Sequence, residues 1–222
     1  MQIETSTTLL DQFGWYFRVR SLAEHPQRIL LLLHGWTGDE NSMWPFAVKF
    51  PREVTILAPR APFSAPKEHG GYSWRELKPG TWGSPTLEEL RPPADGLVSL
   101  VDEWLATHSM PDARFDVVGF SQGGALATLL AILYPQRIRK MAVLAGFVPK
   151  GIGDAHLTPD LLSGIECFWA HGTDDDLVPF ERGRDSAQRL EAAGANVHFC
   201  EAEVGHRVSR ECRNALNTFI AA

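Results

Sequence analysis

The chain has 222 residues and a formal net charge of −6, with 44% hydrophobic and 22% charged residues. This length predicts a single domain, 1–222, with a sizeable core. A negative charge without a basic stripe argues against nucleic-acid partners. The polar start of the sequence lacks the features of a secretory signal, and the longest apolar run is too short to span a membrane.

The cysteines Cys167, Cys200 and Cys212 are odd in number and lack the spacing of a metal site. They predict reduced, mostly buried thiols and a cytoplasmic protein. We expect no metal and no organic cofactor, and either a monomer or a homodimer.

Apolar runs and alternating patterns predict strands in the order that the chain presents them. The strands are expected over 13–20 (in an edge hairpin), 29–33, 54–58, 115–118, 138–144, 165–170 and 197–200. Helical spacing predicts helices over 95–108, 125–133, 180–193 and 209–220, and a short helix capped by Asn41 or Ser42 that ends at Phe50. Strands that alternate with helices across short joints favour a mostly parallel sheet with helices on both faces.

The segment 60–93 shows no periodicity and is rich in proline, glycine and aromatic residues. A long loop without regular structure inside a compact domain is usually functional. It either covers a binding site or is a surface insertion. Apolar walls of a substrate pocket are expected from Phe63, Tyr72, Trp74, Trp82, Phe147, Leu177 and Val178.

The chemistry centres on Ser121, in the pentapeptide Gly119-Phe120-Ser121-Gln122-Gly123. A β-branched strand precedes it and a helix of small residues follows it, which is the context of a nucleophile elbow. In such a turn the serine hydroxyl stands above the edge of the sheet, at the positive end of the helix dipole. The sequence therefore predicts a nucleophilic serine.

A serine nucleophile needs a histidine base that is itself oriented by a carboxylate. His206 lies between the last strand and the last helix, in the chain order that this fold uses. Three carboxylates follow an earlier strand, and spacing does not choose among Asp174, Asp175 and Asp176. His171, at the end of that strand, is expected to have a buried structural role.

Two backbone N–H groups are expected to form an oxyanion hole. One belongs to Gln122, directly after the nucleophile, and the other to Trp36, in the loop after an early strand. His34 is expected to brace that loop.

Four blocks of the sequence together resemble the phospholipase/carboxylesterase family. They are Leu-Leu-His-Gly-x-x-Gly-Asp, Gly-Phe-Ser-Gln-Gly-Gly, His-Gly-Thr-x-Asp-x-x-Val-Pro and Gly-His, and they span residues 31–206 in order. The resemblance implies an α/β-hydrolase fold without a large cap domain. It also implies Ser121 as nucleophile, Asp175 as acid and His206 as base, with Trp36 and Gln122 as oxyanion donors.

The expected function is a serine carboxylesterase that acts on small to medium acyl esters through an acyl-enzyme. The alternatives are an acyl-protein thioesterase or lysophospholipase with longer acyl substrates, and a non-catalytic protein that binds a small ligand on the same fold.

Overall fold

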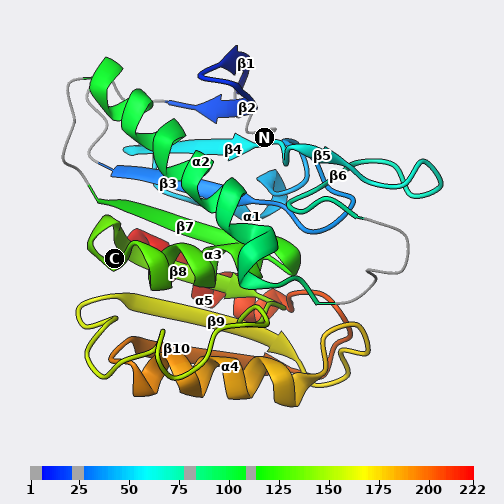
Figure 1. Cartoon of the computed structure of the whole chain (residues 1–222), viewed down its shortest axis with the longest axis vertical. Coiled ribbons are helices and arrows are strands. Elements are labelled where there is room, and N and C mark those ends of the chain that lie inside the picture. The colour runs from blue at the N-terminus through cyan, green and yellow to red at the C-terminus, as the bar shows by residue number, and fades with distance from the viewer. Residues whose placement is uncertain (1–6, 22–27, 78–83, 109–113) are drawn as a thin grey trace.

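The structure, a computed structural model, describes residues 7–21, 28–77, 84–108 and 114–222. An eight-stranded sheet crosses it in the order β1-β2-β4-β3-β7-β8-β9-β10 (Figure 1). The strands are β1 Thr8–Gln12, β2 Trp15–Arg20, β3 Arg28–Leu33, β4 Val54–Pro59, β7 Phe115–Phe120, β8 Ile138–Leu144, β9 Glu166–Gly172 and β10 Asn196–Ala202.

The sheet is parallel from β4 to β10 and antiparallel at its β1-β2-β4 edge. The strand predicted over 13–20 is found as β2, which begins at Trp15 and belongs to a hairpin as expected. Its partner β1, which is the actual edge strand, was not predicted. The all-apolar run of β3 lies between β4 and β7 and is almost entirely buried, as a strand covered on both faces should be.

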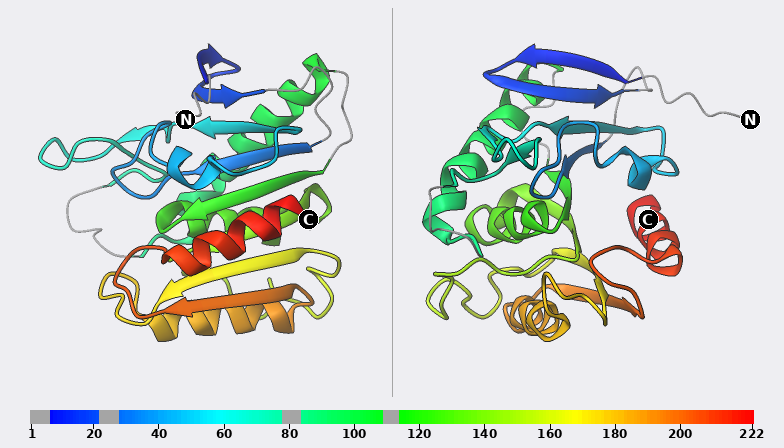
Figure 2. Two further views of the ribbon diagram at one scale, coloured as in Figure 1. Left: turned by 180° about the vertical axis from the view of Figure 1, so that it is seen from behind. Right: turned by 90° about the vertical axis from the view of Figure 1, so that its right-hand side faces the viewer.

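Helices cover both faces of the sheet, as predicted. α2, α3 and α4 lie on one face, and α1 and α5 lie on the other (Figure 2). The helices are α1 Trp44–Ala47, α2 Leu87–Thr107, α3 Gln122–Leu133, α4 Phe180–Ala192 and α5 Arg210–Ala221, with a short 3-10 turn at Pro135–Arg137. Two apolar clusters match these layers, because one joins the sheet to α2, α3 and α4 and the other joins it to α1 and α5.

Helix α2 begins earlier than predicted, at Leu87 instead of residue 95, and contains Pro92 and Pro93. Its start is set by a capping box, in which Thr86 Oγ1 accepts from the Glu89 N–H and Glu89 Oε2 accepts from the Thr86 N–H. The Thr-x-x-Glu signal was present in the sequence, but the prolines obscured it. The short helix α1 is also shorter than predicted and has no side-chain cap.

The segment 60–93 has regular structure where it is described. A small hairpin pairs β5 (Phe63–Ser64) with β6 (Tyr72–Ser73). Tyr72 also pairs with Gly38, in the loop after β3. The segment is therefore joined to the side of the sheet where the parallel strands end and where Ser121 lies.

Cys200 in β10 and Cys212 in α5 form a disulfide, so the prediction of reduced thiols is wrong for these two. α5 packs against β10 and brings the two Cα atoms to 5.7 Å, a consequence of packing that sequence spacing does not reveal. Cys167 is free, and burial raises the pKa of its thiol to about 12. The cytoplasmic location rests partly on reduced thiols and stays a prediction.

Within the described ranges, none of the helices has the length and apolarity needed to cross a membrane.

Candidate active site

Ser121 stands at the sharp turn between β7 and α3. Its backbone has φ 53° and ψ −114°, a left-handed conformation that a residue with a side chain adopts only at a cost. The turn is tight enough to exclude side chains at two flanking positions. A Cβ on Gly119 would lie 2.1 Å from the Gly123 carbonyl oxygen, and one on Gly123 would lie 2.3 Å from the Leu33 carbonyl oxygen. The two glycines therefore permit the turn that presents the serine hydroxyl.

His206 lies beside Ser121, in the loop between β10 and α5. Its Nε2 is 2.9 Å from Ser121 Oγ, and its Nδ1 is 2.7 Å from Asp175 Oδ2. The ring is 15% exposed and packs against Phe120, with 5.1 Å between the ring centroids. A carboxylate that accepts from Nδ1–H leaves the lone pair of Nε2 facing the serine hydroxyl, which is the arrangement that a general base needs.

The three consecutive carboxylates have different surroundings. Asp175 is 5% exposed, whereas Asp174 and Asp176 are exposed to solvent. Asp175 Oδ1 accepts from the N–H groups of Leu177 and Val178, at 3.0 and 2.9 Å, and its Oδ2 faces His206. The turn before α4 thus supplies hydrogen bonds to one buried carboxylate, and the structure brings Asp175 alone of the three to the histidine.

His171 is buried behind this pair. Its Nε2 lies 2.9 Å from the Val178 carbonyl oxygen and 3.4 Å from Asp175 Oδ2. Desolvation lowers the pKa of the imidazole, which therefore stays neutral near pH 7 and donates from Nε2 to Val178. The predicted structural role is confirmed, since His171 braces the turn that carries Asp175.

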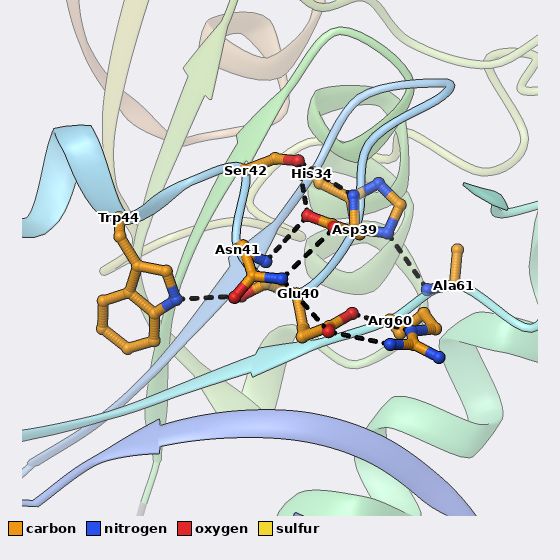
Figure 3. A network of polar contacts seen from close by, with 8 residues as sticks. All are labelled: His34, Asp39, Glu40, Asn41, Ser42, Trp44, Arg60 and Ala61. Carbon is orange, nitrogen blue, oxygen red and sulfur yellow. Dashed lines mark hydrogen bonds and ion pairs between the residues drawn. The ribbon is translucent and has the colours of Figure 1, made fainter. Parts of the chain in front are cut away.

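The loop after β3 carries Trp36, and the His34 side chain holds that loop in place (Figure 3). His34 Nε2 accepts the Ala61 N–H at 3.0 Å, so Nδ1 carries the proton and donates to the Gly35 carbonyl oxygen at 2.7 Å. Burial lowers the pKa of the His34 imidazole, which keeps this neutral tautomer. The predicted bracing role of His34 is confirmed.

An acidic stretch completes the same loop (Figure 3). Glu40 makes a bidentate ion pair with Arg60, at 2.7 and 2.8 Å, and Asp39 accepts from the Ser42 hydroxyl and from the Asn41 N–H, each at 2.9 Å. The hydrogen bonds from Arg60 are the main reason that the pKa of Glu40 is lowered. Held at both ends, the loop presents Trp36 to the space in front of Ser121.

Gln122 is the first residue of α3, so its backbone N–H has no acceptor within the helix. Its buried side chain joins α3 to the segment 60–93. Oε1 accepts the Trp74 N–H at 2.9 Å, and Nε2 donates to Ser73 Oγ at 3.1 Å. Ser73 and Trp74 of this segment therefore brace the elbow from behind.

A cleft of about 550 Å³ opens in front of Ser121. Its walls include several of the predicted site residues: Trp36, Gln122, Phe147, Leu177, Val178 and His206. Phe63, Tyr72 and Trp74 do not line it, so their assignment as pocket walls is wrong, and Trp82 lies outside the described residues.

The three misplaced aromatic residues have other packing roles. Trp74 is fully buried and donates from Nε1 to the His34 carbonyl oxygen at 2.7 Å. The Tyr72 ring lies 4.7 Å from the Arg60 guanidinium, and Phe63 is half-buried in β5. Aromatic content in a loop near the site was thus a poor guide to which side chains face the substrate.

Sequence reasoning missed two arginines that line the cleft, Arg75 and Arg182. Arg182 lies in the first turn of α4. An arginine in an amphipathic helix is ordinarily predicted to be a surface residue. The sequence carried no signal for its position, because the direction of the side chain depends on how α4 packs against the loop after β8.

Comparison with known proteins assigns this chain to a family. Residues 15–222 match the phospholipase/carboxylesterase family. Carboxylesterase SOBER1 of Arabidopsis thaliana is 30% identical over 202 residues, which cover 86% of this chain and 88% of the relative. Acyl-protein thioesterase 1 of Debaryomyces hansenii is 25% identical over 218 residues, 87% of this chain and 90% of the relative.

Solved structures of carboxylesterases share the fold. A solved carboxylesterase from Mesorhizobium loti has a TM-score of 0.80 and 21% identity over 97% of this chain and 99% of that chain. The predicted fold class is confirmed by this likeness and by the sheet order. The chain therefore belongs to the phospholipase/carboxylesterase family, a family of serine ester hydrolases with the α/β-hydrolase fold.

Proposed function

We propose that the chain is a serine carboxylesterase that hydrolyses small to medium acyl esters through an acyl-enzyme on Ser121. The observation that carries the proposal is the continuous chain of short contacts from Ser121 through His206 to Asp175, at the wall of an open cleft. The partner is a small-molecule ester.

In the first half of the reaction, Ser121 Oγ attacks the ester carbonyl carbon while its proton passes to His206 Nε2. The C–O bond to the alcohol then breaks, and the imidazolium returns that proton to the leaving oxygen. Asp175 keeps Nδ1 protonated and stabilises the imidazolium charge. In the second half, water attacks the acyl-enzyme by the same proton transfers, releasing the carboxylic acid and restoring the serine.

The charge on the carbonyl oxygen is assigned to the backbone N–H groups of Gln122 and Trp36. The Gln122 N–H is at the amino end of α3, where the helix dipole favours negative charge. The loop of Trp36 is held by the His34 contacts. One such donor contributes about 3 kcal/mol to transition-state stabilisation in comparable sites.

Hydrolysis of p-nitrophenyl esters from acetate to palmitate, with wild type beside Ser121→Ala, tests the proposal. We expect turnover to be highest with short and medium acyl chains, and kcat to fall by a factor on the order of 10⁶ in the variant. Labelling of Ser121 by a fluorophosphonate is the matched probe. A folded protein that hydrolyses no ester and takes no label would contradict the proposal and favour a non-catalytic binding protein.

An acyl-protein thioesterase is the second candidate, and it is favoured by the similarity to a protein of that name. Highest turnover with long acyl chains, or faster cleavage of thioesters than of the matched esters, would support this candidate over a carboxylesterase. The mostly apolar cleft walls fit either acyl group.

A further inference from the structure

The described walls of the cleft in front of Ser121 carry positive charge without negative charge. Arg75 and Arg182 line it, while none of its described lining residues is an aspartate or a glutamate. The whole chain nevertheless has more acidic than basic residues, 27 against 21. In an acidic protein, a cleft whose described walls carry arginine and no carboxylate is a selective environment for an anion.

The two arginines differ in how their charge is balanced. Arg75 makes an ion pair with Glu89, with 2.6 Å between Nη1 and Oε1. Among the described residues, no carboxylate lies within ion-pair distance of Arg182, and burial alone lowers the pKa of its guanidinium. Of these two arginines, Arg182 is thus the one whose charge no described carboxylate compensates.

Arg182 is held in position at both its backbone and its head group. Its guanidinium carbon lies 3.7 Å from the centroid of the Phe147 ring, and Nη1 donates to Ser84 Oγ. Ser186 Oγ donates to the Arg182 carbonyl oxygen at 2.7 Å and accepts the Val148 N–H at 3.0 Å, which fastens this turn of α4 to the loop that carries Phe147. The guanidinium is therefore preorganised at the wall of the cleft.

Arg20 shows what a buried arginine with a purely structural role looks like in this protein. It is 1% exposed, and three backbone carbonyl oxygens accept from its terminal nitrogens, those of Ala47, Phe50 and Pro51. The single acceptor for Arg182 within the described part of the chain is a hydroxyl. Its guanidinium has the planar fork of donors that matches a carboxylate, and Arg182 lines the cleft.

We propose that Arg182 is a specificity-determining residue that binds a carboxylate of the substrate, so that the preferred substrates are esters with a free carboxylate away from the scissile bond. The inference rests on the proposed esterase function and leaves its reaction steps unchanged. The carboxylate belongs either to the acyl part or to the alcohol part of the ester, and the two cases are separated by experiment.

The acyl case is tested with mono-p-nitrophenyl adipate and p-nitrophenyl hexanoate, whose acyl chains are equally long. The measured quantity is the ratio of the two kcat/KM values, corrected for spontaneous hydrolysis. We expect Arg182→Gln to lower this ratio about tenfold or more, since a hydrogen bond between charged groups is lost. Arg182→Lys keeps the charge without the fork and should give an intermediate ratio.

Arg184→Gln is the matched control, because Arg184 is an exposed arginine on the same helix and does not line the cleft. It makes the same change in net charge and should keep the wild-type ratio. An equal loss in the Arg184 variant would overturn the inference, because the preference would then come from overall charge.

The alcohol case uses p-acetoxyphenylacetate and the neutral p-tolyl acetate in the same way. Loss of preference in the Arg182 variant with this pair alone assigns the carboxylate to the leaving group, and loss with the adipate pair alone assigns it to the acyl group. If Arg182→Gln changes neither ratio, Arg182 does not select substrates and the inference is wrong.

A measurement on the wild type does not depend on the folding of any variant. Boronic acids add reversibly to an active serine, so inhibition by meta- and para-carboxyphenylboronic acid is compared with inhibition by phenylboronic acid. Tighter binding of a carboxylated compound supports the inference, and equal binding of all three contradicts it. Failure of the proposed function is distinguishable, because none of the esters would then be hydrolysed and none of the boronates would inhibit.

Discussion

Charged side chains are paired differently near the two ends of β7. At the start of the strand, the fully buried Asp116 accepts from Arg28 at 2.8 Å and from Arg139 at 2.7 Å. Just beyond the other end, Ser121 has a strained backbone, and Arg182 lines the cleft in front of it with no carboxylate partner among the described residues. The charge that serves stability is paired within the protein, while the charge of Arg182 at the cleft is left for a ligand.

The same contrast distinguishes the carboxylate that we propose for the reaction. Asp175 is buried at the carboxyl end of the sheet, but it is faced by two backbone N–H groups and by His206 and His171 instead of an arginine. An arginine would compete with the imidazolium for its charge. Backbone donors hold Asp175 in place and leave the histidine as its main charged partner during turnover.

The largest expected effect comes from breaking this arrangement. Asp175→Asn should lower kcat by a factor on the order of 10⁴, because the amide favours the wrong tautomer of His206. The adjacent and exposed Asp174 offers a matched control, and Asp174→Asn should retain activity within a few-fold. Steady-state hydrolysis of a p-nitrophenyl ester measures both. Equal losses in the two variants would mean that Asp175 has no special role.

The disulfide between Cys200 and Cys212 gives the cleft end of the sheet a covalent restraint, and the closed loop contains His206. Replacing both cysteines by alanine should lower the free energy of unfolding by about 3 kcal/mol, the loss of loop-closure entropy for a ring of this size. Urea unfolding with and without reductant measures it. Reductant should destabilise the wild type and leave the double variant unchanged, and a wild type insensitive to reductant would contradict the expectation.

At the opposite end, Asp116→Asn should affect stability and leave catalysis intact. It removes the carboxylate shared by Arg28 and Arg139, both of which keep some exposure to solvent, so about 2 to 3 kcal/mol of unfolding free energy is expected to be lost. The half-exposed pair of Asp102 and Arg137 is the control, and Asp102→Asn should cost less than about 1 kcal/mol. A large loss of kcat in folded Asp116→Asn would break the proposed division between the two ends.

How far the sequence predicts this molecule depends on whether a feature is local. The run 138–144 and the pentapeptide around Ser121 predicted β8 and the elbow, because periodicity and a tight turn are properties of neighbouring residues. The chain order of nucleophile, acid and base selected the loop from which His206 contacts Ser121. Local patterns were sufficient for these positions and for the strands of the sheet other than β1, which was not predicted.

Features that depend on packing between distant segments were not predictable in this way. Trp74 contacts Gln122 across 48 positions of the sequence and became a brace instead of a pocket wall. The cysteine pair depends on how α5 packs against β10. Arg182 faces the cleft because α4 is fastened to the loop after β8, which no spacing within the helix reveals.

The smallest expected effect concerns His34, which braces the loop of Trp36. Burial is the main cause of its lowered pKa; Arg60 adds to the effect, and the nearby Asp39 and Glu40 oppose it. Because the pKa is lower in the folded state than in the unfolded state, neutral His34 stabilises the fold fully above about pH 6.5, the ordinary histidine value. That stabilisation is lost as the pH falls below 6.5 toward the pKa of the folded state.

Urea unfolding at several pH values between about 7.5 and 5 checks this dependence, with about 1.4 kcal/mol expected for each unit by which the pKa is lowered. The buried His171 shifts in the same direction, so His34→Gln should remove part of the slope and leave the rest. His156→Gln, which removes an exposed imidazole, is the matched control and should keep the wild-type slope. If His34→Gln also kept the full slope, the loop of Trp36 would owe its stability to the Glu40–Arg60 pair instead of to the neutral imidazole.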